Sequence, residues 1–298
     1  MRNPDSIKAR LKQLALQENK PFDYLMMHYF IERLLFRLSI SQYTDNFILK
    51  GGLLLYVILG NNARATKDID FLAKQLTNTP EELACIFRTI CAIEADDAIR
   101  FDLDSITVDR IKEDAEYEGV RIKVTSYLDK SRHVLQFDIG FGDIVVPKPI
   151  PMEYPSLLDM ERPKIKAYSL ESIIAEKFEA MIALSEANSR MKDFYDVYTL
   201  SRMFAFEGLI LYEAISQTLQ RRGTPLTAVP AVFSDKFMQL KDKQVQWKAF
   251  QRRINVAESV EFPEVIESIK KFIQPVYGAI LEENEWMKSW NCSRQIWL

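Results

Sequence analysis

Apolar and polar residues alternate with a period that changes along the chain, and each change indicates a new element. Residues 6–38 carry apolar side chains every three or four positions, which predicts two helices divided at Pro21. A short apolar helix is expected from Leu53 to Leu59. From Arg64 to Ala73 the pattern becomes strict alternation, which is typical of a half-buried strand.

Residues 80–93 return to a helical period, and the acidic stretch 81–118 is interpreted as a solvated face followed by a loop. Two alternating strands, Val120 to Tyr127 and His133 to Ile139, are expected to form a hairpin. Prolines cluster between residues 147 and 155 and end this part of the chain. Helices are then expected near residues 169–186, 190–206, 207–221, 234–254 and 263–282.

The order of these elements predicts an α+β fold with two domains. Residues 1–155 are expected to form a small mixed sheet with flanking helices. Residues 156–298 are expected to form a mainly α-helical domain.

Composition places the chain among ordinary globular proteins, with 48% hydrophobic residues, 27% charged residues and a net charge of −3. The near-neutral balance excludes polyanion binding by the whole surface, so a nucleic-acid contact requires a local patch. Three cysteines without a CxxC spacing indicate reduced thiols. No signal peptide is recognisable, and the longest apolar run is too short to span a bilayer. We therefore expect a cytoplasmic protein without membrane association.

Two aspartates and two glycines provide the sharpest chemical signal. Asp68 and Asp70 alternate on the predicted strand, so their side chains share a face with Cα atoms about 6.6–7 Å apart. Carboxylates at this spacing suit Mg²⁺, which usually takes one or two of them together with substrate phosphates. Gly51 and Gly52 precede a helix, whose exposed N–H groups and dipole suit a triphosphate. The alternatives are a solvated strand and a glycine pair that only permits close packing.

A third carboxylate, Asp138, interrupts an otherwise apolar strand. A charge at such a position is costly unless it meets a partner or a metal ion. If the two strands are neighbours, Asp138 completes a metal-binding triad with Asp68 and Asp70 and helps to deprotonate the attacking hydroxyl. The alternative is a strand-end aspartate in the turn at residues 140–142.

Two helices of the second half each carry a charge on an apolar stripe. At about 100° per residue, Lys177 falls in the middle of its stripe, while Glu176 and Glu179 fall on the outer face. Asp193 lies on the stripe of the next helix, with Asp196 at its edge. Either Lys177 and Asp193 form a buried ion pair that locks the helices together, or Lys177 contacts nucleotide phosphates and Asp193 orients it. Both interpretations can hold.

Residues 217–253 form a candidate nucleic-acid surface, with eight Lys or Arg against two Asp. Trp247 and Phe250 lie among these basic residues, which suits binding of a tRNA backbone with stacking of bases. The alternative is a solvated helix whose two aromatic side chains pack inward. His28 lies on an apolar helical stripe and is expected to be a hydrogen-bonded core histidine.

Five segments together resemble the AbiEii/AbiGii-type nucleotidyltransferase toxins of the polymerase-β-like superfamily, which also include the MenT toxins. They are FILKGGLLL (47–55), RATKDIDF (64–71), FDIG (137–140), EKFEA (176–180) and RMKDFYDVY (190–198). The chain departs from the family pattern at one place: 15 residues separate Gly52 from Asp68, which is longer than usual. Spacing does not decide whether Asp193 or Asp196 is the family's later aspartate.

The resemblance implies a polymerase-β-like nucleotidyltransferase domain followed by a helical domain that contributes Lys177 and Asp193 to the site. It implies transfer of a nucleoside monophosphate from an NTP to an acceptor hydroxyl, with the 3′ end of tRNA as the expected acceptor. Mg²⁺ is the expected cofactor, and an antitoxin of AbiEi type is the expected partner in a toxin–antitoxin or abortive-infection system. The alternatives are transfer to a small molecule or a protein, and a non-catalytic protein that binds a nucleotide or a partner.

The same resemblance assigns roles to individual residues of this chain. The metal ligands are expected to be Asp68, Asp70 and Asp138. The expected catalytic residues are these three together with Lys177 and Asp193. The residues expected to bind the nucleotide are Lys50, Gly51, Gly52, Arg64, Thr66, Lys177 and Asp196.

Overall fold

The chain forms two compact units in the computed structural model, which describes residues 2–114, 117–254 and 259–298. The first unit comprises Met1–Gly142 and Pro149–Tyr168, and the second comprises Asp143–Lys148 and Ser169–Leu298. The expected boundary between residues 155 and 156 therefore lies inside the first unit. Two short strands after residue 149 still pair with the sheet of that unit, which keeps the chain there as far as Tyr168.

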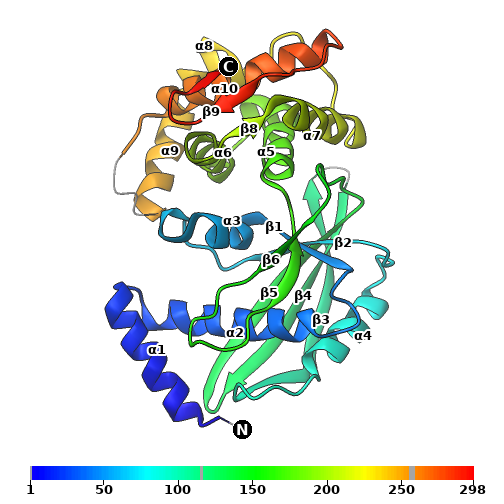
Figure 1. Cartoon of the computed structure of the whole chain (residues 1–298), viewed down its shortest axis with the longest axis vertical. Helices are drawn as coiled ribbons and strands as arrows, with labels where there is room; N and C mark the ends of the chain where they lie inside the picture. The colour runs from blue at the N-terminus through cyan, green and yellow to red at the C-terminus, as the bar shows by residue number, and fades with distance from the viewer. Residues whose placement is uncertain (1, 115–116, 255–258) are drawn as a thin grey trace. The chain divides into compact units, whose positions relative to one another are not determined.

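A seven-stranded mixed sheet forms the centre of the first unit (Figure 1). Its strands are β1 (Phe47–Lys50), β2 (Ile69–Ala73), β3 (Ile99–Asp114), β4 (Tyr117–Leu128), β5 (Ser131–Phe141), β6 (Ile150–Glu153) and β7 (Lys164–Ala167). They lie in the order β3-β4-β5-β2-β1-β7-β6. β2 runs parallel to β5 and antiparallel to β1, while β4 and β5 form the predicted hairpin. The sequence thus predicted β2, β4 and β5 but not β1, β3, β6 and β7.

Four helices flank this sheet: α1 (Pro4–Glu18), α2 (Phe22–Ser39), α3 (Gly51–Leu59) and α4 (Pro80–Cys91). All four agree with the helical periods in the sequence. Phe87 of α4 contacts Phe47 and Phe137 on the sheet, with ring centroids 5.7 and 5.2 Å apart. One face of the sheet is therefore covered by an aromatic core. No helix in the described part of the chain combines the length and apolarity that a bilayer crossing requires.

The acidic stretch before residue 118 is a strand and not the expected loop. β3 pairs with β4 along most of its length, with a register shift between Asp102 and Thr107. Ile99, Phe101 and Ile106 are buried, so the acidic residues alternate with core positions. The prediction was wrong because the many acidic residues made the stretch resemble a solvated loop. The register shift also interrupts the period-two alternation that indicates a strand.

The second unit is mainly helical, as predicted. Its elements are α5 (Leu170–Leu184), α6 (Met191–Met203), β8 (Phe206–Glu207), α7 (Gly208–Arg221), α8 (Asp235–Met238), α9 (Lys241–Ile254), α10 (Phe262–Leu281), β9 (Ser289–Asn291) and β10 (Ile296–Trp297). The helix expected over residues 234–254 is divided into α8 and α9. Residues 143–148 belong here because the backbone of Val146 hydrogen-bonds to the hydroxyls of Ser169 and Ser172, at the start of α5.

A buried ion cluster joins α2 to the chain that follows α4. Arg37 donates to both carboxylate oxygens of Asp97 at 2.6 and 3.1 Å, and Arg33 Nε lies 3.2 Å from the same carboxylate. Asp97 is fully buried and both arginines are 2% exposed. Because these charges are held out of water, each depends on its partners for stabilisation.

Replacement of Arg37 by Met is therefore expected to destabilise the first unit strongly, because Asp97 loses its two-point partner inside the core. We expect the free energy of unfolding to fall by about 3–5 kcal/mol. Urea denaturation followed by circular dichroism measures this change. The control is Lys164→Met, whose ammonium lies 3.8 Å from Glu153 on an exposed surface and should change stability by less than about 1 kcal/mol. Equal effects of the two substitutions would contradict the assignment.

Candidate functional site

A row of four charged residues crosses the sheet of the first unit. Lys50 of β1 is paired with Asp70 of β2, Asp70 with Asp138 of β5, and Asp138 with Arg121 of β4. Residues that are paired across neighbouring strands point to the same face of a sheet. We call these four residues the charge row. It lies on the face opposite Phe71 and the aromatic core, because Phe71 follows Asp70 in the alternation.

Arg121 is the member of the charge row that no sequence motif indicated. Its Nε and Nη2 atoms donate to the two carboxylate oxygens of Asp138, each at 2.8 Å. The pKa of Arg121 is raised chiefly by this hydrogen bond, against the effect of burial, and further by the charges of Asp138 and Asp68. The alternation in residues 120–127 placed Arg121 away from the core, but only the strand register shows that it faces Asp138.

The carboxylates do not form the expected three-residue metal cluster. Among residues 2–114, 117–254 and 259–298, no group of three or more His, Cys, Asp or Glu side chains is placed to hold a metal ion. Both oxygens of Asp138 accept hydrogen bonds from Arg121. Asp68 is exposed directly before β2, and Asp70 is half-buried on it. Carboxylates at such positions are of the kind that can bind a cation together with substrate phosphates.

The nucleotide-binding residues expected in the first unit gather at the start of α3. Gly51 has a φ of +68°, and a Cβ atom at this position would overlap the carboxylate of Asp70. A Cβ atom on Gly52 would come within 2.7 Å of Thr66 Oγ1 and 3.3 Å of Arg64 Nη2. The absence of both side chains lets an acidic, a hydroxyl and a basic group approach the helix N-terminus. The positive end of the helix dipole favours an anion there.

Lys50 ends β1 immediately before these glycines. It is 8% exposed, and its ammonium lies 5.3 Å from the centroid of the Tyr168 ring. The ring face is electron-rich and therefore attracts a cation. Lys50 thus supplies a buried positive charge next to Asp70 in the charge row.

A second group of expected site residues lies in the second unit, where Lys177 is held by two aspartates. Lys177 Nζ lies 2.7 Å from Asp193 Oδ1 and 2.8 Å from Asp196 Oδ2. Arg190 Nε donates to the other oxygen of Asp193 at 2.6 Å. Burial alone would raise the pKa of Asp193, but the charges of Lys177 and Arg190 lower it to about 2. The predicted buried ion pair is confirmed, and Asp196 shares it, so the structure gives both aspartates a contact with Lys177.

Glu176 and Glu179 do not lie on an outer face of α5, so that prediction was wrong. Arg222, which follows α7, donates to Glu179 at 2.8 Å and lies 3.2 Å from Asp143 and 3.8 Å from Glu176. Burial alone would lower the pKa of Arg222, but the three carboxylates raise it. The helical period assigns charged positions to the solvent-facing side of a helix. It could not predict this cluster, because α7 covers the face of α5 that carries these glutamates.

The basic segment 217–253 does not present its aromatic residues for stacking. Trp247 is fully buried and donates to the carbonyl of Val260 at 2.7 Å, and Phe250 is also buried. Lys243 is buried as well and donates to the carbonyl of Asn188 at 2.8 Å. The inward-packing alternative is thus confirmed for both aromatic residues, because they complete the core between α6 and α9.

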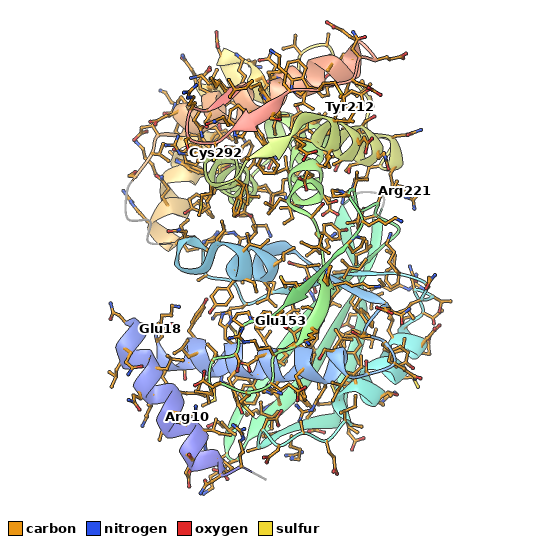
Figure 2. All side chains as sticks on the ribbon, in the orientation of Figure 1. Arg10, Glu18, Glu153, Tyr212, Arg221 and Cys292 are labelled. Carbon is orange, nitrogen blue, oxygen red and sulfur yellow. The ribbon has the colours of Figure 1, made fainter. Side chains whose placement is uncertain are left out.

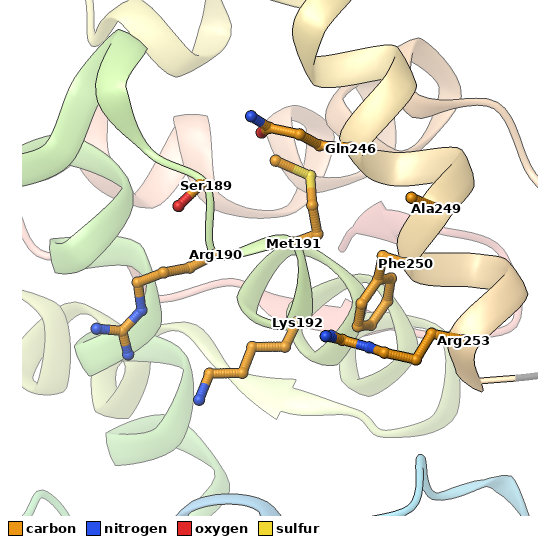
Figure 3. A pocket seen from close by; sticks show the side chains of 8 residues that line it. All are labelled: Ser189, Arg190, Met191, Lys192, Gln246, Ala249, Phe250 and Arg253. Atoms are coloured by element: carbon orange, nitrogen blue, oxygen red, sulfur yellow. The ribbon is translucent and has the colours of Figure 1, made fainter.

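A cavity of about 480 Å³ lies between the start of α6 and α9 within the second unit. Figure 3 shows Arg190, Lys192 and Arg253 along it, with the ring of Phe250 between the two helices. Arg253 also lies 5.6 Å from the centroid of the Phe250 ring. Arg190 is already paired with Asp193, so Lys192 and Arg253 are the two cations that favour an anionic ligand at this cavity.

A known protein family contains the motifs at the start of α3 and around Lys177. The sequence profile of the family "Nucleotidyl transferase AbiEii toxin, Type IV TA system" matches residues 33–269. The chain belongs to the AbiEii family. The resemblance drawn from the five segments is thereby confirmed, as are the α+β fold and the nucleotidyltransferase class of the protein. An AbiEii protein is a toxin of a type IV toxin–antitoxin system, which implies a nucleotide substrate and an antitoxin partner.

Two solved structures are similar to this AbiEii chain, both from Helicobacter pylori. One is a protein assigned as a nucleotidyltransferase, with 13% identity, a TM-score of 0.47, and coverage of 89% of this chain and 97% of its own. The other is JHP933, with 15% identity, a TM-score of 0.45, and coverage of 84% and 90%. No curated protein matches the chain.

Replacement of Gly51 by Ala is expected to displace Asp70 from the start of α3. We expect nucleotidyl transfer to fall about 100-fold, since a shift of about 1 Å in a positioned group can cost that much. Initial rates of nucleotidyl transfer from labelled NTPs measure the effect.

Gly223→Ala is the matched control, because Gly223 has a φ of +63° and nothing within 4 Å of its added Cβ atom. Both variants carry the strain of a positive φ, about 1–2 kcal/mol, but only one disturbs the charge row. Similar activity of the two variants would remove Gly51 from the site.

Proposed function

We propose that this AbiEii protein is a Mg²⁺-dependent nucleotidyltransferase of the cytoplasm that transfers a nucleoside monophosphate from an NTP to the 3′ end of tRNA. An antitoxin of AbiEi type controls it. The observation that carries the proposal is the approach of the Asp70 carboxylate to Gly51, at the N-terminus of α3. This places acidic oxygens next to backbone N–H groups, which is the combination that a cation–triphosphate complex needs.

The residues present fit a Mg²⁺ ion by the chemistry of their donors. Asp68 and Asp70 would hold it through carboxylate oxygens, and the remaining positions suit phosphate oxygens and water. When bound, the ion supplies charge neutralisation on the phosphates and lowers the pKa of the acceptor hydroxyl. Asp138 lies beside Asp70 and is held by its ion pair with Arg121, which compensates its negative charge. It stays the predicted acceptor of the hydroxyl proton.

The triphosphate would lie at the start of α3. The N–H groups after Gly51 and Gly52 would donate to its oxygens, and Arg64, near Gly52, would supply a further positive charge. The acceptor oxygen forms a bond to the α-phosphorus, the bond to the β-phosphate oxygen breaks, and pyrophosphate leaves. Such a transfer depends mainly on positioning and on charge stabilisation. The contact of Lys177 with nucleotide phosphates stays a prediction.

An RNA acceptor is supported by the basic cavity of the second unit. Arg190, Lys192 and Arg253 line it, and Lys241 and Arg252 are exposed on the same helix as Arg253. Contacts of this kind bind the phosphate backbone and do not require stacking of bases. The burial of Trp247 and Phe250 therefore limits the predicted surface to backbone recognition.

The cytoplasmic location rests on the thiols. Cys85, Cys91 and Cys292 are all free. Free cysteines are typical of a reducing compartment, where NTPs and tRNA are available as substrates.

Replacement of Asp70 by Asn, or of Asp68 by Asn, is expected to lower nucleotidyl transfer by about 100–1,000-fold, because one charged ligand of the cation is lost. Label transfer from each of the four NTPs to total tRNA measures it. Chelation of divalent cations by EDTA should abolish transfer, and added Mg²⁺ should restore it.

Asp104→Asn is the control, since Asp104 is an exposed aspartate on β3 outside the charge row. Unchanged transfer by Asp70→Asn, or full activity in EDTA, would contradict the proposed role of the carboxylates.

Reversal of two charges at the basic cavity, Lys192→Glu with Arg253→Glu, is expected to weaken transfer to tRNA about tenfold or more at physiological salt. It should also reduce the dependence of binding on salt, since two phosphate contacts are lost. The same rates measured from 50 to 200 mM salt test this expectation.

The control reverses two exposed lysines of the first unit, Lys130→Glu with Lys164→Glu. If the cavity variant keeps full activity and the same salt dependence, the acceptor is not an RNA bound at this cavity. Transfer to a small molecule or a protein would then become the leading interpretation.

A further inference from the structure

A second cavity, of about 440 Å³, lies within the first unit at the other end of α3. It is formed by the end of α1, the middle of α2, the last turns of α3 and the chain at residues 154–157. Its aromatic lining consists of His28, Tyr56 and Tyr154, and Leu14, Val57 and Leu157 add apolar surface. Volume and lining are those of a small-molecule site, in which a few polar groups are set in an apolar wall.

Two of the lining side chains are buried polar groups without partners. His28 is 1% exposed and Tyr154 is 2% exposed. Both ring nitrogens of His28 and the hydroxyl of Tyr154 have no hydrogen-bond partner within the described residues. The expected hydrogen bond of His28 is thus not found, although its burial is confirmed. Unpaired buried polar groups are rare because their desolvation is not compensated, so a ligand in the cavity explains both of them.

The histidine is held between two other rings and is neutral. The His28 ring centroid lies 4.3 Å from that of Tyr24 and 4.5 Å from that of Tyr56. Burial, with a smaller effect of Lys20, lowers the pKa of His28 to about 4. A neutral imidazole has one N–H donor and one nitrogen acceptor, and the Tyr154 hydroxyl can act as either.

The charges at the edge of this cavity cancel. Lys20 and Glu18 both line it and form an ion pair at 2.7 Å. Figure 2 marks Glu18 at the end of α1, where it is exposed. Among the residues that the structure describes, no other charged side chain lines this cavity, so its lining gives no preference for a charged ligand.

The cavity is separate from the charge row. Gly51 begins α3 beside Asp70, whereas Tyr56, Val57 and Gly60 lie toward its C-terminal end. At about 1.5 Å of rise per residue, the nine residues of α3 place its two ends about 13 Å apart. A ligand here does not compete with the phosphates proposed at the helix N-terminus.

We propose that this cavity binds a nucleobase, with His28 and Tyr154 hydrogen-bonding to its polar edge. A nucleobase is planar and uncharged and carries donors and acceptors on one edge, which matches a neutral imidazole, a phenol and apolar walls. Base–aromatic stacking on Tyr56 adds to its affinity. The chemistry is the same for a free nucleoside and for a base at an RNA end.

The test uses NMR spectra of the full chain labelled with ¹⁵N-histidine. The chain has only two histidines, His28 and His133. Adenosine, guanosine, cytidine and uridine are titrated separately without Mg²⁺, and an RNA tetranucleotide of mixed sequence forms a second arm. We expect a saturable shift of the His28 ring nitrogens with at least one probe, and the two arms distinguish the free nucleoside from the RNA base. Absence of any shift at about 10 mM of every probe, a weak millimolar limit, would overturn the proposal.

Variants then separate the site from its surroundings by equilibrium dialysis with labelled probe. Tyr154→Phe removes only the hydroxyl and should weaken binding about tenfold, and His28→Phe should weaken it at least as much. His133→Gln is the control, because His133 packs on Phe30 outside the cavity. Unchanged affinity in Tyr154→Phe would overturn the assignment, even if His28→Phe fails to fold.

Asp70→Asn distinguishes this proposal from the proposed function. It should lose transfer but bind the probe with unchanged affinity, because Asp70 is not among the residues that line the cavity. Loss of nucleobase binding in Asp70→Asn would place the bound base at the charge row and would overturn the separate site. If the proposed transfer reaction were wrong, the dialysis result would still stand.

Discussion

Asp70 and Asp138 are paired on the neighbouring parallel strands β2 and β5. Their two negative charges repel each other, and the arrangement of the other charged residues compensates this repulsion. Like charges at directly opposite positions destabilise a sheet unless opposite charges are near. Arg121 binds Asp138 on one side, and Lys50 is paired with Asp70 on the other. The two central carboxylates thus have one cation at each end of the row. Asp70 lies beside the start of α3, where a Cβ atom on residue 51 would overlap it, so this position requires glycine.

The glycine pair connects this electrostatic arrangement to phosphate chemistry. Gly51 has no Cβ atom to push Asp70 away, and Gly52 has none to push away Thr66 and Arg64. Acidic, hydroxyl and basic groups can therefore stand around one helix N-terminus. The same short helix reaches the His28 cavity with its other end. α3 thus serves two distinct environments, one charged and one apolar, because its two ends differ in dipole and in neighbours.

In the second unit, buried ion pairs connect helices to one another, whereas the charge row of the first unit lies along one sheet. Lys177 is shared by Asp193 and Asp196, and Arg222 by Asp143, Glu176 and Glu179. Each cation joins separate elements, so a cluster specifies how the helices pack as well as which charges are neutralised. The low pKa of Asp193 follows from this, since its carboxylate has two cationic partners in a buried place.

The sequence by itself determined the helices, the central strands, the family and the acidic residues that mark the site. Period and motif are local properties, so Asp68, Asp70 and the glycine pair could be found from neighbouring residues. Only the tertiary structure decided which strands lie side by side, and hence that Arg121 occupies both oxygens of Asp138. It also decided that Glu179 and Trp247 point inward and that His28 has no hydrogen-bond partner among the described residues. These outcomes depend on residues far apart in the chain, whose side chains meet only when the sheet register and the helix packing are formed.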